Sequence, residues 1–126
     1  GILCSHIIEH LEKQKGLRLI EDIENLASRK IVIGTPNGFH APHLDVNITP
    51  LQDHRSFYTP SEFSSRGYTV RGQGLELVYG DKGLMSKLPD WLKPMATIIS
   101  YSLSPLTYFI PKLATHLICW KKVGKT

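Results

Sequence analysis

Residues 30–38 read Lys30-Ile-Val-Ile-Gly-Thr-Pro-Asn-Gly38, and this stretch decides which fold the sequence predicts. Ile31 to Ile33 form an uninterrupted β-branched run, which is typical of a strand buried on both faces. Turn chemistry follows at once, because proline fixes φ and an Asn-Gly pair tolerates positive φ. Open α/β sheets bind their ligands where a buried strand ends in such a loop. The alternative is a core strand followed by a tight turn without a ligand.

A strand and a helix precede this stretch. Gly1-Ile-Leu-Cys4 has the pattern of a buried strand, and Ser5-His6 would form its carboxyl end. From Glu12 to Ser28, apolar residues recur at helical spacing, and charged residues occupy the opposite face. Strand, helix and strand in this order predict a βαβ unit, with two parallel strands and a right-handed crossover.

A helix and two strands are predicted downstream. Thr59-Pro60-Ser61-Glu62 has the N-cap, the N1 proline and the glutamate of a capping box, and Gly67 would end this helix. Tyr68 to Arg71 alternates as a strand, which Gly72-Gln-Gly74 would break. The final strand is predicted at His116 to Lys121.

Residues 39–57 form a long segment with two prolines, three histidines and few periodic apolar positions. A loop of this length in a compact domain is usually a lid or a binding segment. His40, His43 and Asp45, with His54 nearby, include the residue types of a metal site. Their spacing fits no helical pair and no thiolate is near, so we predict no metal.

Two other motifs do not match the functional sites that they partly resemble. Gly72-x-Gly74 lacks the third glycine and precedes no clear helix, so it is not a dinucleotide fingerprint. Ser5 could pair with His6 or His10 as nucleophile and base, but no G-x-S-x-G elbow surrounds it. The alternative is that Glu9 and His10 have a structural role in the connection between the strand and the helix, either as a cap or by fixing the tautomer of a histidine.

The run from Pro94 to Pro111, PMATIISYSLSPLTYFIP, has no charged residue. Its serines make it less apolar than most membrane spans, and Pro105 would break a single helix. We therefore predict two short helices, broken at or near Pro105, that pack over the strand-end loops and cover a pocket there. Packing over one sheet face and contact with a membrane surface are the alternatives.

The composition of the 126-residue chain predicts one small globular domain with an ordinary hydrophobic core. Hydrophobic residues make up 41% and charged residues 21%, which is usual for this class. The net charge of +4 comes from dispersed basic residues, and this pattern does not favour nucleic-acid binding. Cys4 and Cys119 lie far apart in apolar runs, which indicates reduced core residues in a cytoplasmic protein.

Several of these segments together resemble the C-terminal half of a class I S-adenosylmethionine-dependent methyltransferase of the type 11 kind. In family order they are an E-H-L segment after a strand, a strand ending in T-P-N, an H-R-S segment, and a helix followed by R-G-Y-x-V. In this chain they span residues 2–72 and read Ser5-His-Ile-Ile-Glu-His-Leu11, Lys30 to Asn37, His54-Arg-Ser56, Thr59-Pro-Ser-Glu-Phe63 and Arg66-Gly-Tyr-Thr-Val70.

The resemblance implies a partial Rossmann-like methyltransferase sheet, with parallel strands and an antiparallel last strand inserted among them. Residues 116–123 resemble that last strand, and 73–115 would be a helical insert within the single partial domain 1–126. The family's glycine-rich cofactor turn and acidic ribose-binding residue are absent. We therefore expect the chain to be the C-terminal part of the fold and to self-associate through an exposed sheet edge.

The resemblance also implies a cofactor and two residues that contact it. Ser5 and His6 match positions near the methionine end of S-adenosylmethionine, at the end of the fourth family strand. The adenosine and ribose contacts belong to the absent half of the fold. We therefore expect weak cofactor binding, or none, by this chain.

For the acceptor, the resemblance implies four substrate-binding residues: Asn37, Gly38, His54 and Arg55. His6 and His54 are the predicted catalytic residues, since imidazole can take a proton from a hydroxyl or amine nucleophile near neutral pH. The uncharged insert favours a small or lipid-like acceptor. The alternatives are a non-catalytic α/β interaction module and a membrane-surface protein anchored by residues 94–111.

Overall fold

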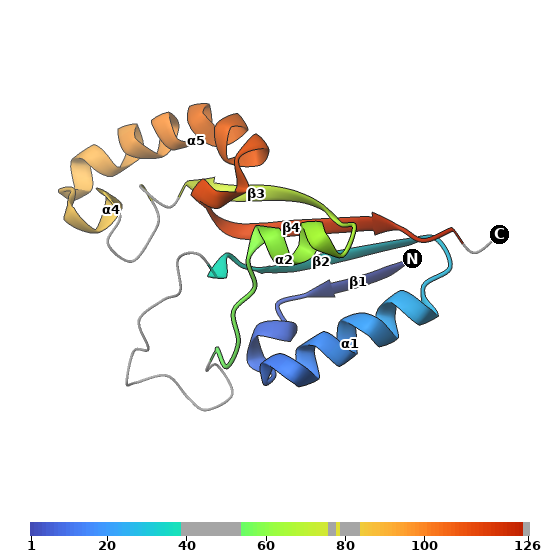
Figure 1. Cartoon of the computed structure of the whole chain (residues 1–126). Coiled ribbons are helices and arrows are strands. Elements are labelled where there is room, and N and C mark those ends of the chain that lie inside the picture. Colours follow the sequence, from blue (N-terminus) through green and yellow to red (C-terminus); the bar gives the residue numbers. More distant parts are fainter. Residues whose placement is uncertain (39–53, 76–77, 79–83, 125–126) are drawn as a thin grey trace.

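The structure, a computed structural model, describes residues 1–38, 54–75, 78 and 84–124. Its four strands form one sheet in the order β1-β2-β4-β3 (Figure 1). β1 and β2 are parallel, while β4 is antiparallel to both β2 and β3. A mixed α/β fold with an inserted, antiparallel last strand is therefore confirmed. The strands are β1 (Ile2–Ser5), β2 (Lys30–Pro36), β3 (Thr69–Leu75) and β4 (Ala114–Lys122).

Helices connect the strands. η1 (Ile8–His10) and α1 (Lys13–Leu26) link β1 to β2, and α2 (Pro60–Ser65) precedes β3. Further helices lie between β3 and β4 in the part of this interval that the structure describes, and Figure 1 shows the longest of them beside β3. They are α4 (Leu84–Lys87), η3 (Asp90–Leu92), α5 (Lys93–Phe109) and η4 (Pro111–Leu113).

The core lies between the sheet and the two helices α1 and α2. Ile31 and Ile33 of β2 pack there against Ile20 of α1 and Phe63 of α2. Both cysteines are free and buried, as predicted, and burial raises the pKa of the Cys119 thiol to about 12. The thiol of Cys119 is therefore protonated at neutral pH and acts as a small apolar core group.

The opposite face of the sheet is largely open, and the prediction that β2 is buried on both faces is wrong. Burial alternates along β2, with Ile31 and Ile33 enclosed and Val32 half-buried. The adjacent Leu3, which pairs with Val32, is 72% exposed. Among the described elements, α1 and α2 cover only the first face. The outer edge of β1 also pairs with no described strand, so self-association through it stays a prediction.

The capping box of α2 is confirmed. Pro60 takes the first turn, and the backbone N–H of Thr59 donates to the Glu62 carboxylate at 2.7 Å. Lys13 of α1 forms an ion pair with Glu62 at 2.6 Å. Partial burial opposes ionisation of Glu62, but hydrogen bonds from Lys13 and Thr59 outweigh it and lower the pKa. The helix ends before Gly67, whose φ is +82° as expected for a helix C-terminus.

β3 does not break at its glycines, contrary to the prediction. Gly72 pairs with Leu117 of β4, and the strand continues to Leu75. Pairing along the long β4 strand outweighs the weak strand preference of glycine. The helical segments therefore occupy the interval between Leu75 and Ala114, which is slightly shorter than the predicted insert at 73–115.

α5 is one helix, so the prediction of two helices broken at Pro105 is wrong. Pro105 lies inside it, and Figure 1 shows the helix curving over its length. A proline removes only one helix hydrogen bond, and packing of the Ala96, Ser100 and Thr107 side against β3 offsets that loss. None of the helices in the described ranges has the length and apolar character needed to cross a bilayer.

Candidate functional site

The candidate site lies where β1 and β2 end. Because these strands are parallel, their carboxyl ends meet at one edge of the sheet. Ser5 pairs with Gly34, and the N–H of His6 donates to the Gly34 carbonyl at 2.9 Å. His6 has a φ of +52°, an uncommon conformation for a residue with a side chain. Such strained backbone at a strand end is a recurrent feature of ligand sites.

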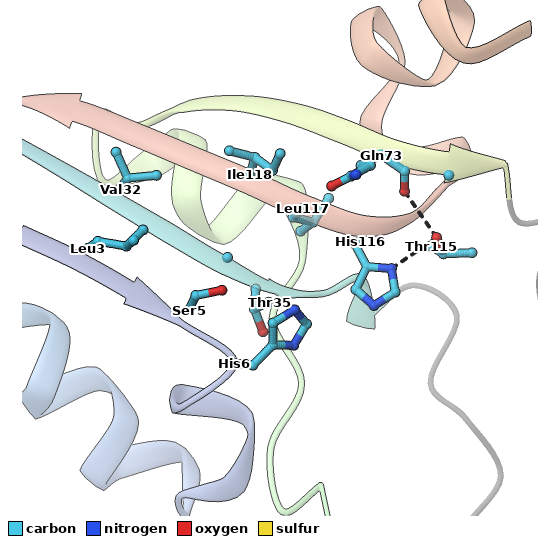
Figure 2. Close-up of a pocket in the computed structure, with 12 residues that line it drawn as sticks. Leu3, Ser5, His6, Val32, Thr35, Gln73, Thr115, His116, Leu117 and Ile118 are labelled. Carbon is cyan, nitrogen blue, oxygen red and sulfur yellow. Dashed lines mark hydrogen bonds between the residues drawn. The ribbon is translucent and has the colours of Figure 1, made fainter. Parts of the chain in front are cut away.

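A groove opens at this edge, on the uncovered face of the sheet (Figure 2). Its volume is about 620 Å³, which suits a small organic molecule. Ser5, His6 and His116 supply polar groups, while Leu3 and Ile118 belong to its apolar wall. No acidic side chain is present among the described residues that line it.

Two histidines from distant parts of the chain meet in the groove. The ring centroids of His6 and His116 are 5.5 Å apart, edge to face, and Figure 2 shows the two rings side by side. Partial desolvation by the surrounding protein lowers the pKa of His116 although its side chain is exposed, and the neighbouring His6 and His54 lower this pKa further, against the opposing effect of Glu9. His116 is therefore neutral at pH 7.

Hydrogen bonds determine which nitrogen of His116 is available. The Thr115 hydroxyl donates to the Gln73 carbonyl at 3.0 Å, so its lone pair accepts from Nδ1–H of His116 at 3.1 Å (Figure 2). The neutral ring then has Nε2 as its acceptor nitrogen. The groove thus contains an imidazole base that sequence reasoning did not assign to the site.

A second group of residues lies behind the groove, around Glu9 of η1. Glu9 is only 1% exposed, and one carboxylate oxygen accepts from His6 Nδ1 at 3.0 Å. Its backbone carbonyl accepts from the N–H groups of Arg55 and Ser56 at 2.8 and 3.1 Å. The Ser56 hydroxyl donates to the Ile8 carbonyl at 3.0 Å. These bonds fix the segment containing His54 against η1.

The structure places the predicted site residues in three locations: the groove, the region behind it, and the end of β2, where Asn37 and Gly38 lie. Ser5 and His6 line the groove. His54 lies against His10 behind it, with ring centroids 5.1 Å apart and the rings tilted by 56°, and the exposed Arg55 follows. The tautomer-fixing role proposed for Glu9 applies to His6, through the hydrogen bond to its Nδ1.

Asn37 and Gly38 are occupied by structural hydrogen bonds and do not belong to the described groove lining. Asn37 is 1% exposed, and its amide donates to the carbonyls of Pro111 and Ala114 at 3.0 and 2.8 Å. The N–H of Gly38 donates to the Tyr58 carbonyl at 2.9 Å. The bonds of Asn37 join the end of β2 to η4 and β4, and the bond of Gly38 joins it to the segment before α2. The substrate-binding role predicted for both residues remains a prediction.

α5 does not cover the groove as predicted, because none of the described lining residues comes from it. Instead, Ser100, Tyr101 and Ser104 of α5 line a smaller cavity of about 180 Å³ against Gln73 and Leu75 of β3. Packing on the edge strand β3 places the helix away from the ends of β1 and β2. The histidines and aspartate considered at 40–45 lie outside the described residues.

His116 shows what sequence reasoning missed. Its strand was predicted, and alternation with Leu117 would have placed it on the face opposite the core. The sequence did not show the register of the two strands, which pairs His116 with Pro36 at the end of β2 and so brings it to the groove. A register set by tertiary contacts cannot be read from a single strand.

Comparisons of the chain with family models, with curated proteins and with solved structures give no significant match.

Proposed function

We propose that this chain is the substrate-side half of an S-adenosylmethionine-dependent methyltransferase that acts on a small or lipid-like acceptor. The observation that supports this most directly is the position of Ser5 and His6. They stand at the end of β1, beside the neighbouring parallel strand, and face a groove of small-molecule size. The methyltransferase resemblance implies this position for both residues. Two buried free cysteines fit the cytoplasmic location that we also propose.

The sheet adds independent support. The resemblance implies a last strand that is inserted antiparallel, and β4 lies between β2 and β3 and runs against both. It also implies helices after the first two strands, and α1 and α2 occupy one face together. A Rossmann-like sheet is therefore part of the proposal.

The groove fits one end of the implied cofactor. The Ser5 hydroxyl and the His6 imidazole, whose side chain is 54% exposed, lie beside an apolar wall, and this combination suits an amino-acid moiety next to a thioether. The cofactor would supply an electrophilic sulfonium methyl group. Because no acidic side chain is present in the described lining, a ribose would find no carboxylate there, and weak binding follows.

The chain's own groups would handle the acceptor and its proton. With the cofactor bound, a hydroxyl or amine acceptor would gain the methyl group and give up one proton, and the electron pair of the broken carbon–sulfur bond would remain on sulfur. The acceptor proton passes to an imidazole nitrogen in the groove, on His6 or on the neutral His116. Glu9 holds His6 in place through Nδ1.

Titration with S-adenosylhomocysteine, followed by NMR of the ¹⁵N-labelled chain, tests this assignment. We expect binding in the millimolar range, with amide shifts centred on Ser5, His6 and Gly34, because these residues surround the predicted methionine end. Adenosine, which lacks the amino-acid portion, is the matched control and should leave the three amides unchanged. Equal shifts with adenosine, or shifts with S-adenosylhomocysteine that centre on residues away from Ser5, His6 and Gly34, would refute the cofactor assignment.

A second candidate function is contact with a membrane surface through α5. Its exposed face is unusually apolar for a helix in contact with water, and Ile98 is 66% exposed. Lys93 begins the helix and Lys112 follows it, so cations flank the apolar face as in interfacial helices. The exposed apolar side chains of α5 are Met95, Ile98, Ile99, Tyr101, Leu103, Leu106, Tyr108 and Phe109.

Co-sedimentation with vesicles of phosphatidylcholine and phosphatidylglycerol tests this candidate. Ile98→Glu should weaken partitioning into the vesicles at least about tenfold, since it removes an aliphatic group that the lipid would bury and adds a charge repelled by the anionic lipid. Leu3→Glu is the matched control, because Leu3 is equally exposed but lies on the open sheet face. Absence of the wild-type chain from the vesicle pellet, or an equal loss in the control, would exclude the membrane role.

A further inference from the structure

Three potential metal ligands converge behind the groove: Glu9, His10 and His54. One ligand atom from each lies within 4.8 Å of the others, with Glu9 buried and the two histidines half-buried. None of the three is among the described residues lining the groove. The cluster therefore lies next to the site proposed for methyl transfer, and the hydrogen bond between Glu9 and His6 connects the two.

Glu9 has an unsatisfied oxygen at this point. Its side chain is 99% buried, and Oε2 has no hydrogen-bond partner among the described residues. The other oxygen binds only the His6 imidazole, and no described Lys or Arg forms an ion pair with this carboxylate. A buried carboxylate without full compensation is costly, so it indicates a missing positive partner.

We propose that Glu9, His10 and His54 bind a divalent transition-metal cation of the zinc type. Two imidazoles and one carboxylate favour Zn²⁺ or Co²⁺ over Mg²⁺ and Ca²⁺, which prefer all-oxygen sets. Neighbouring ligand atoms around tetrahedral zinc are about 3.4 Å apart, given metal–ligand bonds of about 2.1 Å. Small side-chain rotations close the present separation of up to 4.8 Å.

The surrounding hydrogen bonds hold these ligands in place. The N–H groups of Arg55 and Ser56 donate to the Glu9 carbonyl, so the His54 segment cannot move away from η1 without breaking both bonds. The hydrogen bond from His6 orients the carboxylate, as outer partners of metal ligands commonly do. Three protein ligands leave a fourth position for water or for an oxygen of another molecule. The proposal departs from the sequence-based prediction of no metal, and it holds whether or not the chain transfers methyl groups.

Metal titration of the chain, after removal of metal with a chelator, tests the proposal. We expect Zn²⁺ to bind with about 1:1 stoichiometry by calorimetry and to raise the thermal unfolding temperature. Co²⁺ should give the intense visible d–d absorption of a low-coordinate nitrogen and oxygen site. His10→Gln and His54→Gln should each weaken Zn²⁺ binding by at least about 100-fold, because each removes a direct ligand.

His116→Gln is the matched control, because His116 lies in the groove and outside the cluster. It should keep the wild-type affinity for Zn²⁺. Glu9→Gln is less suitable as the main variant because Glu9 is fully buried, whereas the two half-buried histidines tolerate glutamine more readily. Lack of stoichiometric Zn²⁺ binding by the wild-type chain would overturn the proposal, and so would an equal loss of affinity in His116→Gln.

Discussion

Gly72→Ala is expected to lower the free energy of unfolding by about 3 kcal/mol or more. A Cβ atom at this position would lie 2.2 Å from the Thr107 carbonyl oxygen and 2.5 Å from the Ala114 Cβ. Both distances are far inside van der Waals contact, and the first obstacle is backbone. α5 and the start of β4 would have to move away from β3 to make room.

Urea unfolding followed by circular dichroism measures this effect. The matched control is Gly124→Ala, because no atom lies within 4 Å of a Cβ built there. In an open strand position, alanine would be favoured over glycine by roughly 0.5–1 kcal/mol. Propensity alone would therefore predict that Gly72→Ala stabilises the protein, whereas the steric clash predicts that it destabilises it. Equal stability of the two variants would show that α5 does not pack on β3 as described.

Asn37→Asp is expected to lower the free energy of unfolding by about 3 kcal/mol or more at neutral pH. The side-chain amide donates to two carbonyls, of Pro111 and Ala114, within a fully buried environment. The substitution keeps the shape but replaces the donor by a carboxylate oxygen that faces two carbonyl oxygens. Burial and this repulsion both favour protonation of the new group in the folded state.

The loss of stability caused by Asn37→Asp should therefore become smaller as the pH falls. A group whose folded-state pKa is raised stabilises the protein most below its unfolded pKa, and that contribution disappears as the pH rises through the folded value. Denaturant unfolding at several pH values tests this. The control is Asn25→Asp, on the exposed end of α1, which should change the free energy of unfolding by less than about 1 kcal/mol. An unchanged stability of Asn37→Asp would show that the hydrogen bonds from Asn37 to Pro111 and Ala114 do not stabilise the fold.

The two substitutions address the same junction from both sides. Gly72 allows η4 and the end of α5 to approach β3, and Asn37 ties η4 to the end of β2. The end of β2 lies beside the His6 and His116 pair, through the register of β2 with β4. The helical connection therefore stabilises the edge of the sheet at which the groove opens, although its residues are not among the described lining.

Local patterns in the sequence predicted the elements whose causes are local. The helix at Lys13–Leu26 follows from apolar residues spaced three and four apart, and the capping box at Thr59 and Glu62 needs only neighbouring residues. The parallel pairing of β1 and β2 follows from their order, because a helical crossover between two strands favours it. The strand-end position of Ser5 and His6 was therefore accessible from the sequence.

Only the tertiary structure decided the features that depend on distant contacts. Pro105 should have broken α5, yet packing against β3 keeps one helix, because many side-chain contacts outweigh one lost hydrogen bond. The approach of His116 to His6, and of His54 to Glu9 and His10, depends on strand register and on two backbone bonds to η1. The sequence alone indicated the four strands, α1 and α2, and their order along the chain. The tertiary contacts decided which histidines meet, because no local rule relates residues so far apart in the chain.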